Sequence, residues 1–284
     1  MKKILSALII SLNAVLLSAC SQGAFFAANL PQYFSDVTIK QNVAFGDKPI
    51  EKLDIYIPEK ADDRAKPVVV FLHGGRWADG TKEDYRFVGL KMAKYGYITV
   101  IPDYSKYPDV KFPVFVEDSA KALAWTHDHI SEYGGDTSKI YLLGHSSGAH
   151  IAGLVAANPE YLGAFEKDRN IIAGFAGLAG PYAFVPEEED LKDMFGPPER
   201  YPEMRTNTFI DGKQPPMLLM HGNDDDLVST QNAYKVQKAA AEKGGEVIVK
   251  TYDGYDHTDL MRDFTWIGSE KSPVIQDILT FLKK

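Results

Sequence analysis

The sequence predicts a single α/β domain with an eight-stranded, mostly parallel sheet and helices on both faces. Its 284 residues are 45% hydrophobic and 25% charged, which is enough apolar material for one large core. From about residue 36 onward, short apolar stretches alternate with longer segments of helical periodicity. Such alternation is typical of a parallel sheet covered by helices. We find no internal repeat.

The strand candidates begin with Asp36–Phe45 and Glu51–Ile57, which we expect to form an antiparallel pair. Pro67–His73 is a continuous apolar run, typical of a strand that is buried on both faces. Five more candidates follow along the chain: Tyr97–Pro102, Lys139–Leu143, Ile171–Leu178, Met217–Met220 and Glu246–Tyr252.

Helical segments are expected between these strands, because apolar residues there recur at helical spacing. The five candidates are Lys82–Tyr95, Val114–Tyr133, Ser147–Ala157, Thr230–Lys243 and Ser272–Leu282. Strands and helices together place one folded domain over residues 36–284.

The segment 184–214 interrupts the alternation between the sixth and seventh strands. An acidic run, Glu187–Asp190, is followed there by three prolines. The segment is either a solvated loop or a small cap over a substrate site. In the second case, its apolar side chains would form pocket walls: Phe184, Phe195, Tyr201 and Met204.

The first 19 residues have the pattern of a secretory signal peptide. Lys2 and Lys3 precede the apolar stretch Ile4–Leu17, and small residues follow it. That stretch is short for a membrane span and is interrupted by polar residues. An uncleaved anchor remains the alternative interpretation.

Cys20 follows this leader and is the only cysteine in the chain. The sequence Leu17-Ser18-Ala19-Cys20 resembles the lipobox of bacterial lipoproteins, in which the cysteine is acylated and becomes the first mature residue. The resemblance implies an exported lipoprotein, tethered to a bacterial membrane through residues 20–35. In a Gram-negative host, Ser21 favours the outer membrane.

The net charge argues against a nucleic-acid partner. It is −8 at pH 7, and no cluster of lysine and arginine stands out along the chain. The sequence makes no prediction of the oligomeric state.

The segment Gly144-His145-Ser146-Ser147-Gly148 lies directly after a predicted strand and directly before a predicted helix. In that context a G-x-S-x-G sequence predicts a sharp turn that lifts the Ser146 hydroxyl above the sheet as a nucleophile. The backbone N–H of Ser147, at the helix N-terminus, would face a developing oxyanion.

His73-Gly74-Gly75-Arg76-Trp77 follows the third strand. It is either a plain tight turn or a loop whose backbone N–H groups approach the same oxyanion. A nucleophile turn further along the chain favours the second interpretation. The oxyanion-hole candidates are the backbone N–H group of Ser147 and those of this glycine-rich loop, which contains Gly74, Gly75 and Arg76.

An acid and a base are expected after the seventh and eighth strands, in the chain order Ser, Asp, His. His257 is the only histidine beyond the acidic loop, which contains Asp224, Asp225 and Asp226. His145 and His150 flank the nucleophile and are expected to pack or to form hydrogen bonds instead: neighbours along the chain cannot easily reach across the site.

These motifs resemble the esterase branch of the α/β hydrolases that contains bifunctional feruloyl and acetyl-xylan esterases, kynurenine formamidases and isoprenylcysteine methylesterases. Further marks are Asp103-Tyr104 and residues 132–136. The resemblance extends from about Asp36 to the C-terminus. It implies the α/β-hydrolase fold, with Ser146 acylated, His257 as base and Asp225 as the orienting acid. It also implies an oxyanion hole formed by the N–H groups of Gly75, Arg76 and Ser147. Arg76 stands where the hormone-sensitive-lipase branch has a third glycine.

The expected chemistry is acyl transfer from a small ester, without a metal or a cofactor. Trp77 and the aromatic cap residues would narrow the pocket and favour short acyl chains. A formamidase or another small-amide hydrolase would use the same triad and stays an alternative. A non-catalytic binding protein on this fold is a further alternative, although such proteins usually lose a triad residue.

Overall fold

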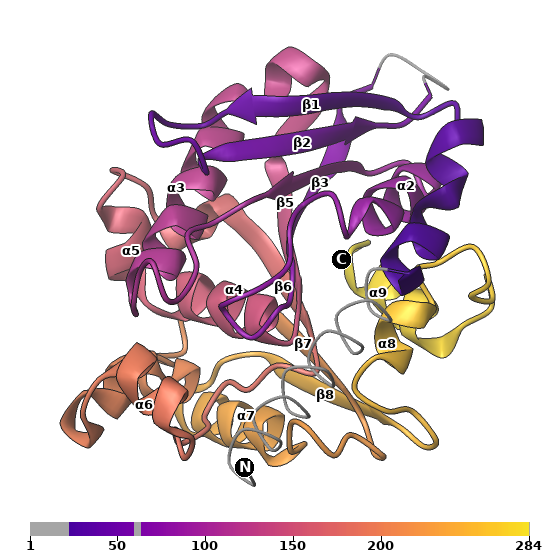
Figure 1. Cartoon of the computed structure of the whole chain (residues 1–284). Helices are drawn as coiled ribbons and strands as arrows, with labels where there is room; N and C mark the ends of the chain where they lie inside the picture. Colours follow the sequence, from indigo (N-terminus) through magenta and orange to yellow (C-terminus); the bar gives the residue numbers. More distant parts are fainter. Residues whose placement is uncertain (1–22, 60–63, 284) are drawn as a thin grey trace, which may run out of the picture.

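A computed structural model describes residues 23–59 and 64–283. It contains one eight-stranded sheet in the order β1-β2-β4-β3-β5-β6-β7-β8 (Figure 1). Only β2 runs against the other strands, because it pairs antiparallel with both β1 and β4, whereas the pairs from β4 to β8 are parallel. This arrangement confirms the predicted α/β class and the mostly parallel sheet.

All eight predicted strands are present, with shifted ends: β1 (Thr38–Ala44), β2 (Lys52–Ile57), β3 (Lys66–Leu72), β4 (Ile98–Pro102), β5 (Gly135–His145), β6 (Ile172–Leu178), β7 (Met217–Gly222) and β8 (Val247–Tyr252). Every residue of β4 and β7 is buried, as expected for strands covered on both faces. The largest shift is in β5, which begins four residues before Lys139 and reaches the residue before Ser146.

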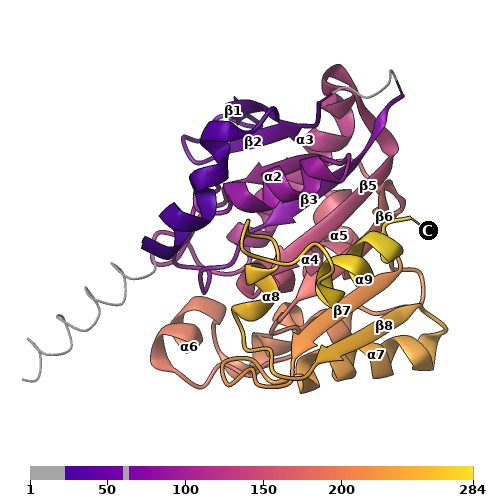
Figure 2. The same ribbon diagram turned by 90° about the vertical axis from the view of Figure 1, so that its right-hand side faces the viewer.

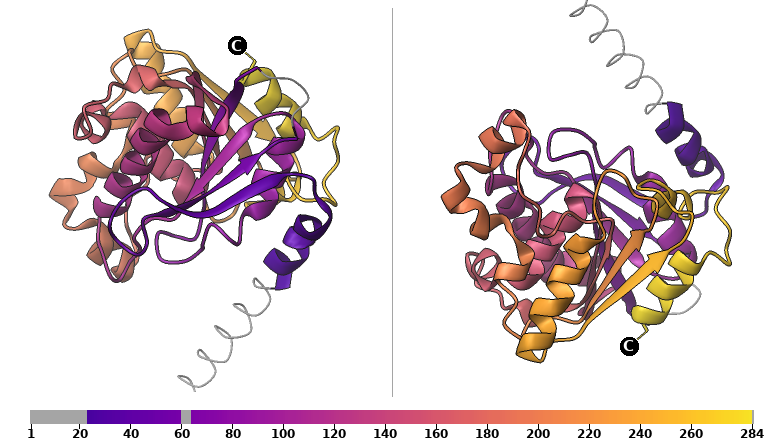
Figure 3. Two further views of the ribbon diagram at one scale, coloured as in Figure 1. Left: turned by 90° about the horizontal axis from the view of Figure 1, so that it is seen from above. Right: turned by 90° about the horizontal axis from the view of Figure 1, so that it is seen from below.

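Two helix layers enclose the sheet (Figure 3). The larger layer contains α3 (Val114–His129), α4 (Ser147–Ala157), α5 (Pro159–Gly163) and α7 (Gln231–Lys243). The other contains α2 (Arg86–Lys94), α8 (Asp259–Arg262) and α9 (Pro273–Phe281). Val68 and Val70 of β3 belong to the first core, whereas Val69 and Phe71 belong to the second. This alternation buries both faces of the strand.

The helix predicted from Lys82 begins four residues later, at Arg86. The Asp84 carboxylate accepts hydrogen bonds from the backbone N–H (2.9 Å) and the hydroxyl (3.0 Å) of Thr81. These contacts close a turn that competes with the helix.

The segment expected as a tether, 20–35, differs from that expectation within its described part. Residues 23–29 form an α-helix and Leu30–Phe34 a 3₁₀-helix, η1. Asn29 fastens the segment to the N-terminus of α2: its amide donates to the carbonyls of Glu83 (3.1 Å) and Asp84 (2.9 Å) and accepts from the N–H of Phe87 (2.8 Å). Residues 1–22, with the predicted signal peptide and Cys20, lie outside the described part of the chain.

The interrupted segment 184–214 contains α6 (Glu189–Phe195) and two 3₁₀-helices, η4 (Pro198–Met204) and η5 (Thr206–Thr208). No helix within the described ranges is long and apolar enough to cross a membrane.

Candidate active site

Ser146 lies at the sharp turn between β5 and α4, as the sequence predicts. Its backbone has φ 53° and ψ −123°, a strained conformation for a residue with a side chain. The glycines on either side permit the turn. A Cβ on Gly144 would lie 2.7 Å from the Gly148 carbonyl oxygen, and a Cβ on Gly148 would lie 2.1 Å from that of Leu72. Helix and strand therefore approach closely enough to project Ser146 from the carboxyl edge of the sheet.

The loops after β7 and β8 bring an acid and a base to this serine. His257 Nε2 is 2.9 Å from Ser146 Oγ, and His257 Nδ1 is 2.8 Å from Asp225 Oδ2. The carboxylate accepts a hydrogen bond from Nδ1–H of His257, which leaves the unprotonated Nε2 free to take the serine proton. Ser146 and His257, predicted from chain order, and Asp225, which the resemblance implies, thus form one continuous hydrogen-bonded chain.

Asp225 is the carboxylate that reaches His257 among the three candidates. Its Oδ1 accepts hydrogen bonds from the backbone N–H groups of Leu227 (3.0 Å) and Val228 (2.8 Å), so its orientation is fixed. Burial alone would raise its pKa, but the contacts with His221 and His257 outweigh burial and hold the pKa well below its ordinary value. Asp225 therefore remains ionised at neutral pH.

His145 and His150 form hydrogen bonds behind the site, which confirms the role expected for them. His145 Nε2 donates to the backbone carbonyl of His257 (3.0 Å). His150 Nε2 donates to the Met204 carbonyl (2.6 Å), and His150 Nδ1 accepts from the Trp77 indole (3.2 Å). Burial lowers the pKa of His145 to about 3 and that of His150 to about 4. Both rings are therefore neutral near pH 7.

The loop after β3 lies against the nucleophile, and its geometry depends on glycine. A Cβ on Gly74 would lie 3.3 Å from Ser146 Cβ, so the loop passes directly over the serine. Gly75 has φ +130°, and a Cβ there would lie 2.1 Å from the Asp79 carbonyl oxygen. Arg76 and Trp77 continue the loop with φ values of 54° and 60°. The chain thus folds into a tight, strained loop that only glycine allows at position 75.

The His73 ring fixes one peptide of this loop. Its Nδ1 donates to the Gly74 carbonyl oxygen (2.8 Å). Because a trans peptide is planar, the N–H of Gly75 points opposite to that carbonyl and away from the ring. This orientation is compatible with an oxyanion-hole role for Gly75. The oxyanion contacts predicted for Gly74, Gly75, Arg76 and Ser147 stay a prediction.

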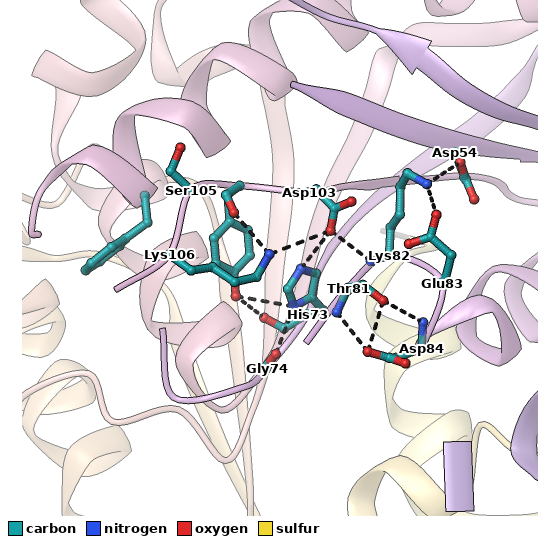
Figure 4. Close-up of polar contacts among 12 residues, drawn as sticks. Asp54, His73, Gly74, Thr81, Lys82, Glu83, Asp84, Asp103, Ser105 and Lys106 are labelled. Atoms are coloured by element: carbon teal, nitrogen blue, oxygen red, sulfur yellow. Dashed lines mark hydrogen bonds and ion pairs between the residues drawn. The ribbon is translucent and has the colours of Figure 1, made fainter. Parts of the chain in front are cut away.

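A buried polar cluster supports His73 from the other side (Figure 4). Asp103 Oδ1 lies 3.5 Å from His73 Nε2 and accepts from the backbone N–H of Lys82 (3.0 Å). The His73 ring stacks on Tyr104 with 4.5 Å between centroids, and the Tyr104 hydroxyl donates to the His73 carbonyl (2.7 Å). The sequence analysis used Asp103-Tyr104 only as a mark of resemblance and did not predict that both side chains contact His73.

A cavity of about 720 Å³ opens beside Ser146 and His257. Its walls come from the loop after β3, from residues 226–235 and from the segment 184–191; they include Arg76, Trp77, Phe184 and Leu191. Part of the interrupted segment 184–214 therefore borders the site, as a cap would. Within the described ranges, no group of histidine, cysteine and carboxylate side chains could hold a metal ion.

Two features tie this cap to the loop after β3. The Arg76 guanidinium contacts Glu188 (2.7 Å) and Asp190 (3.0 Å). The Trp77 ring stacks on Phe184 and meets Phe195 edge to face, with 5.3 Å and 4.9 Å between ring centroids.

Phe184 alone of the four predicted wall residues lines the cavity. Phe195, Tyr201 and Met204 are buried in the core instead. Phe195 packs behind Trp77, where it supports the wall without facing the cavity.

The sequence matches two family profiles: BD-FAE over residues 53–174 and the prolyl oligopeptidase family over residues 116–284. It is 28% identical to the isoprenylcysteine alpha-carbonyl methylesterase ICME of Arabidopsis thaliana over 88% of this chain and 63% of that protein. It is 25% identical to the esterase LipC of Mycobacterium tuberculosis over 86% of this chain and 65% of that protein. The chain thus spans less than two thirds of the length of these relatives.

Solved structures show the same fold. Esterase B from Lactobacillus rhamnosis superposes with a TM-score of 0.80 at 18% identity, over 96% of this chain and 93% of that one. A truncated carbohydrate esterase from gut microbiota superposes with a TM-score of 0.74 at 16% identity, over 87% and 95%. These likenesses confirm the α/β-hydrolase fold. The second profile covers more than half of the chain and includes Ser146, Asp225 and His257, so the chain belongs to the prolyl oligopeptidase family.

Proposed function

We propose that the protein is a serine carboxylesterase that hydrolyses short-chain acyl esters through an acyl-enzyme on Ser146. The observation that carries the proposal is the relay from Asp225 through His257 to Ser146 Oγ, with distances of 2.8 Å and 2.9 Å, at the wall of a cavity. Esterases and methylesterases among the similar proteins agree with it.

In the first step, His257 Nε2 takes the Ser146 proton as Oγ attacks the acyl carbon of the ester. The carbonyl electrons move to oxygen, and the resulting oxyanion would be stabilised by the backbone N–H groups of Gly75, Arg76 and Ser147. When the tetrahedral intermediate collapses, the bond to the leaving alcohol breaks, and the alcohol leaves with the proton from Nε2.

In the second step, water replaces the alcohol. Nε2 of His257 takes a proton from the water as its oxygen attacks the acyl carbon bound to Ser146. The second tetrahedral intermediate releases the acid, and the proton returns to Oγ. Throughout, Asp225 holds the imidazole and stabilises the transient imidazolium.

The aromatic wall supports a preference for short acyl groups. Trp77 is 4% exposed, because Phe184, Phe195 and His150 surround its ring. A wall packed in this way cannot move aside for a long chain without breaking contacts among several rings.

Amide hydrolysis is the second candidate, because the chain belongs to a family named after an oligopeptidase. A panel of p-nitrophenyl acetate, butyrate and palmitate, N-formylkynurenine and an aminoacyl anilide separates the two candidates. We expect the highest kcat/KM for the acetyl and butyryl esters, and none of these activities in Ser146→Ala. Faster cleavage of the anilide or of N-formylkynurenine would favour the amide reaction. A higher kcat/KM for palmitate would contradict the proposed size limit.

We further propose that acylated Cys20 anchors the protein to a bacterial membrane as an exported lipoprotein. The support is the lipobox-like sequence before the sole cysteine. Several buried acyl chains, each stabilised by about 0.8 kcal/mol per methylene, hold a protein durably on a bilayer. Cys20→Ser should lose the radiolabel after growth with labelled palmitate and leave the membrane fraction. Retention of both label and membrane association by the variant would contradict the proposal.

A further inference from the structure

Six exposed apolar side chains lie near one another on the protein surface, and none of them lines the cavity beside Ser146. Nine large hydrophobic side chains are exposed within the described ranges, and six of them lie on the N-terminal helical segment 23–34 or on the nearby loop before α9. The six are Phe26, Leu30, Tyr33, Phe34, Trp266 and Ile267. Scattered exposed apolar residues are ordinary in a water-soluble domain, whereas a concentration of them marks an interaction surface. We call these six side chains the apolar face.

The helical segment has two contrasting sides. Its inner side is fastened to α2 through Asn29, and the Phe25 ring packs on Tyr85 with 5.2 Å between ring centroids. Phe26, Leu30 and Tyr33, at helical spacing, are 65%, 37% and 68% exposed. A surface helix normally has polar residues on its outer side. An apolar outer side, as found here, is typical of a helix that lies at the boundary between water and an apolar phase.

Trp266 joins the loop to the helical segment. Its indole N–H donates to the carbonyl of Ala27 (2.9 Å), while its side chain remains 59% exposed. The neighbouring Ile267 is 66% exposed. Tyrosine and tryptophan favour membrane interfaces, because one end of each side chain is polar and the rest is apolar. Segment and loop are therefore in direct contact.

We propose that the apolar face rests on the lipid bilayer that holds the anchor. The structure describes the chain from Gly23, and Cys20 lies three residues earlier. Three residues of extended chain span at most roughly 11 Å, so acyl groups on Cys20 would bring the bilayer surface close to the first turn of the helix. An interfacial helix inserts its apolar side roughly 5–10 Å, a depth that single exposed side chains can reach.

This orientation would also set where the active site lies. Phe25 packs on Tyr85, and Tyr85 stacks on His73, which holds the loop beside Ser146. The helical segment therefore lies near the carboxyl edge of the sheet, and in the view of Figure 2 both this segment and α6 are at the left. A bilayer against the apolar face would hold the cavity at a fixed height above the lipid surface.

The test uses the full protein isolated from membranes and reconstituted in vesicles of phosphatidylethanolamine and phosphatidylglycerol. A nitroxide group near the lipid headgroup quenches tryptophans that enter the interface. We expect quenching in the unchanged protein, loss of the quenched component in Trp266→Phe, and its retention in Trp125→Phe. Trp125 is the matched control, because it lies on α3 in the other helix layer. Equal emission in labelled and unlabelled vesicles would overturn the proposal.

A second set of variants separates lipid contact from other uses of the surface. Tyr33→Ser, Phe34→Ser and Ile267→Ser combined should reduce Trp266 quenching, whereas Tyr234→Ser, an exposed aromatic on α7, should not. If Trp266 is not quenched on vesicles and the protein forms a dimer that buries the apolar face, the occupant of that face is a second copy of the chain. That result would overturn the proposal. So would absence of the protein from membranes, because the proposal rests on the anchor. Hydrolysis of p-nitrophenyl acetate reports separately on the esterase function.

Discussion

His145 donates a hydrogen bond through Nε2 to the backbone carbonyl of His257, across 3.0 Å. The residue before the nucleophile thus holds the loop that carries the base. Burial lowers the pKa of His145 to about 3, so its ring is neutral near pH 7. The contact links β5 to the loop after β8, two segments more than a hundred residues apart in the chain.

His145→Phe keeps a ring but removes the donor, so the loop of His257 should lose its fixed position. We expect kcat on p-nitrophenyl acetate to fall by roughly fivefold, since a hydrogen bond contributes about 1 kcal/mol, with KM little changed. The control is Tyr141→Phe on the same strand, which should retain normal turnover. A change in KM alone would contradict a positioning role for His145.

Asp225→Asn should lose about four orders of magnitude in kcat while remaining folded, by analogy with the orienting aspartate of serine proteases. Asp224→Asn and Asp226→Asn are matched controls in the same loop and should retain most activity. Steady-state rates on one activated ester, with circular dichroism to establish folding, decide the matter. A large loss of turnover in Asp224→Asn or Asp226→Asn, with near-normal turnover in Asp225→Asn, would refute the assignment of Asp225 as the orienting acid.

Gly75→Ala and Arg76→Ala should differ sharply. The alanine Cβ at position 75 would clash with the Asp79 carbonyl at 2.1 Å, so the loop must move and kcat should fall about 10²–10³-fold, as when an oxyanion donor is lost. Arg76→Ala keeps its backbone N–H and removes a side chain of the cavity wall with its two exposed ion pairs, to Glu188 and Asp190; each such pair contributes about 0–1 kcal/mol. The measurement is kcat of each variant, Gly75→Ala and Arg76→Ala, on acetyl and butyryl esters. Equal losses would contradict a backbone role for this loop.

Acid should destabilise the protein from about pH 6.5 downward. An unfolded histidine has a pKa of about 6.5, whereas the folded-state pKa values of His145 and His150 are lowered to about 3 and about 4. Protons therefore bind the unfolded chain first, and stability falls as pH drops towards the folded values, by about 1.4 kcal/mol per pH unit for each histidine. Urea unfolding at several pH values measures how steeply the free energy of unfolding changes with pH. His150→Gln should make the free energy of unfolding less dependent on pH. An unchanged dependence in that variant would contradict the lowered folded-state pKa of His150.

Ser146, His257 and an acidic loop could be predicted because each follows a strand in the order that the fold requires, whereas the choice of Asp225 within that loop came from the resemblance to known esterases. Ser146 stands in a glycine-framed motif, and His257 is the only histidine after the acidic loop. The contact of His145 with His257, and that of Asp103 with His73, could not be predicted. These contacts depend on how the ends of separate strands are arranged across the sheet, and no local sequence pattern predicts that arrangement.

The segment 20–35 shows a different limit of sequence reasoning. Its small and polar composition suggested a tether, yet residues 23–34 are helical, and Asn29 and Phe25 hold them against the N-terminus of α2. Similarly, α2 begins at Arg86 because the Asp84 carboxylate stabilises a turn. In both cases, tertiary or side-chain contacts outweigh local propensity.

The central claim is that Ser146 carries the acyl group. A p-nitrophenyl phosphonate with a short alkyl chain reacts with an activated serine, releases p-nitrophenol and leaves a stable adduct that peptide mass spectrometry can locate. We predict one adduct per chain, on Ser146, that forms in step with loss of esterase activity and is absent from Ser146→Ala and strongly slowed in His257→Gln. An adduct on another residue, or full inhibition without modification of Ser146, would contradict the account.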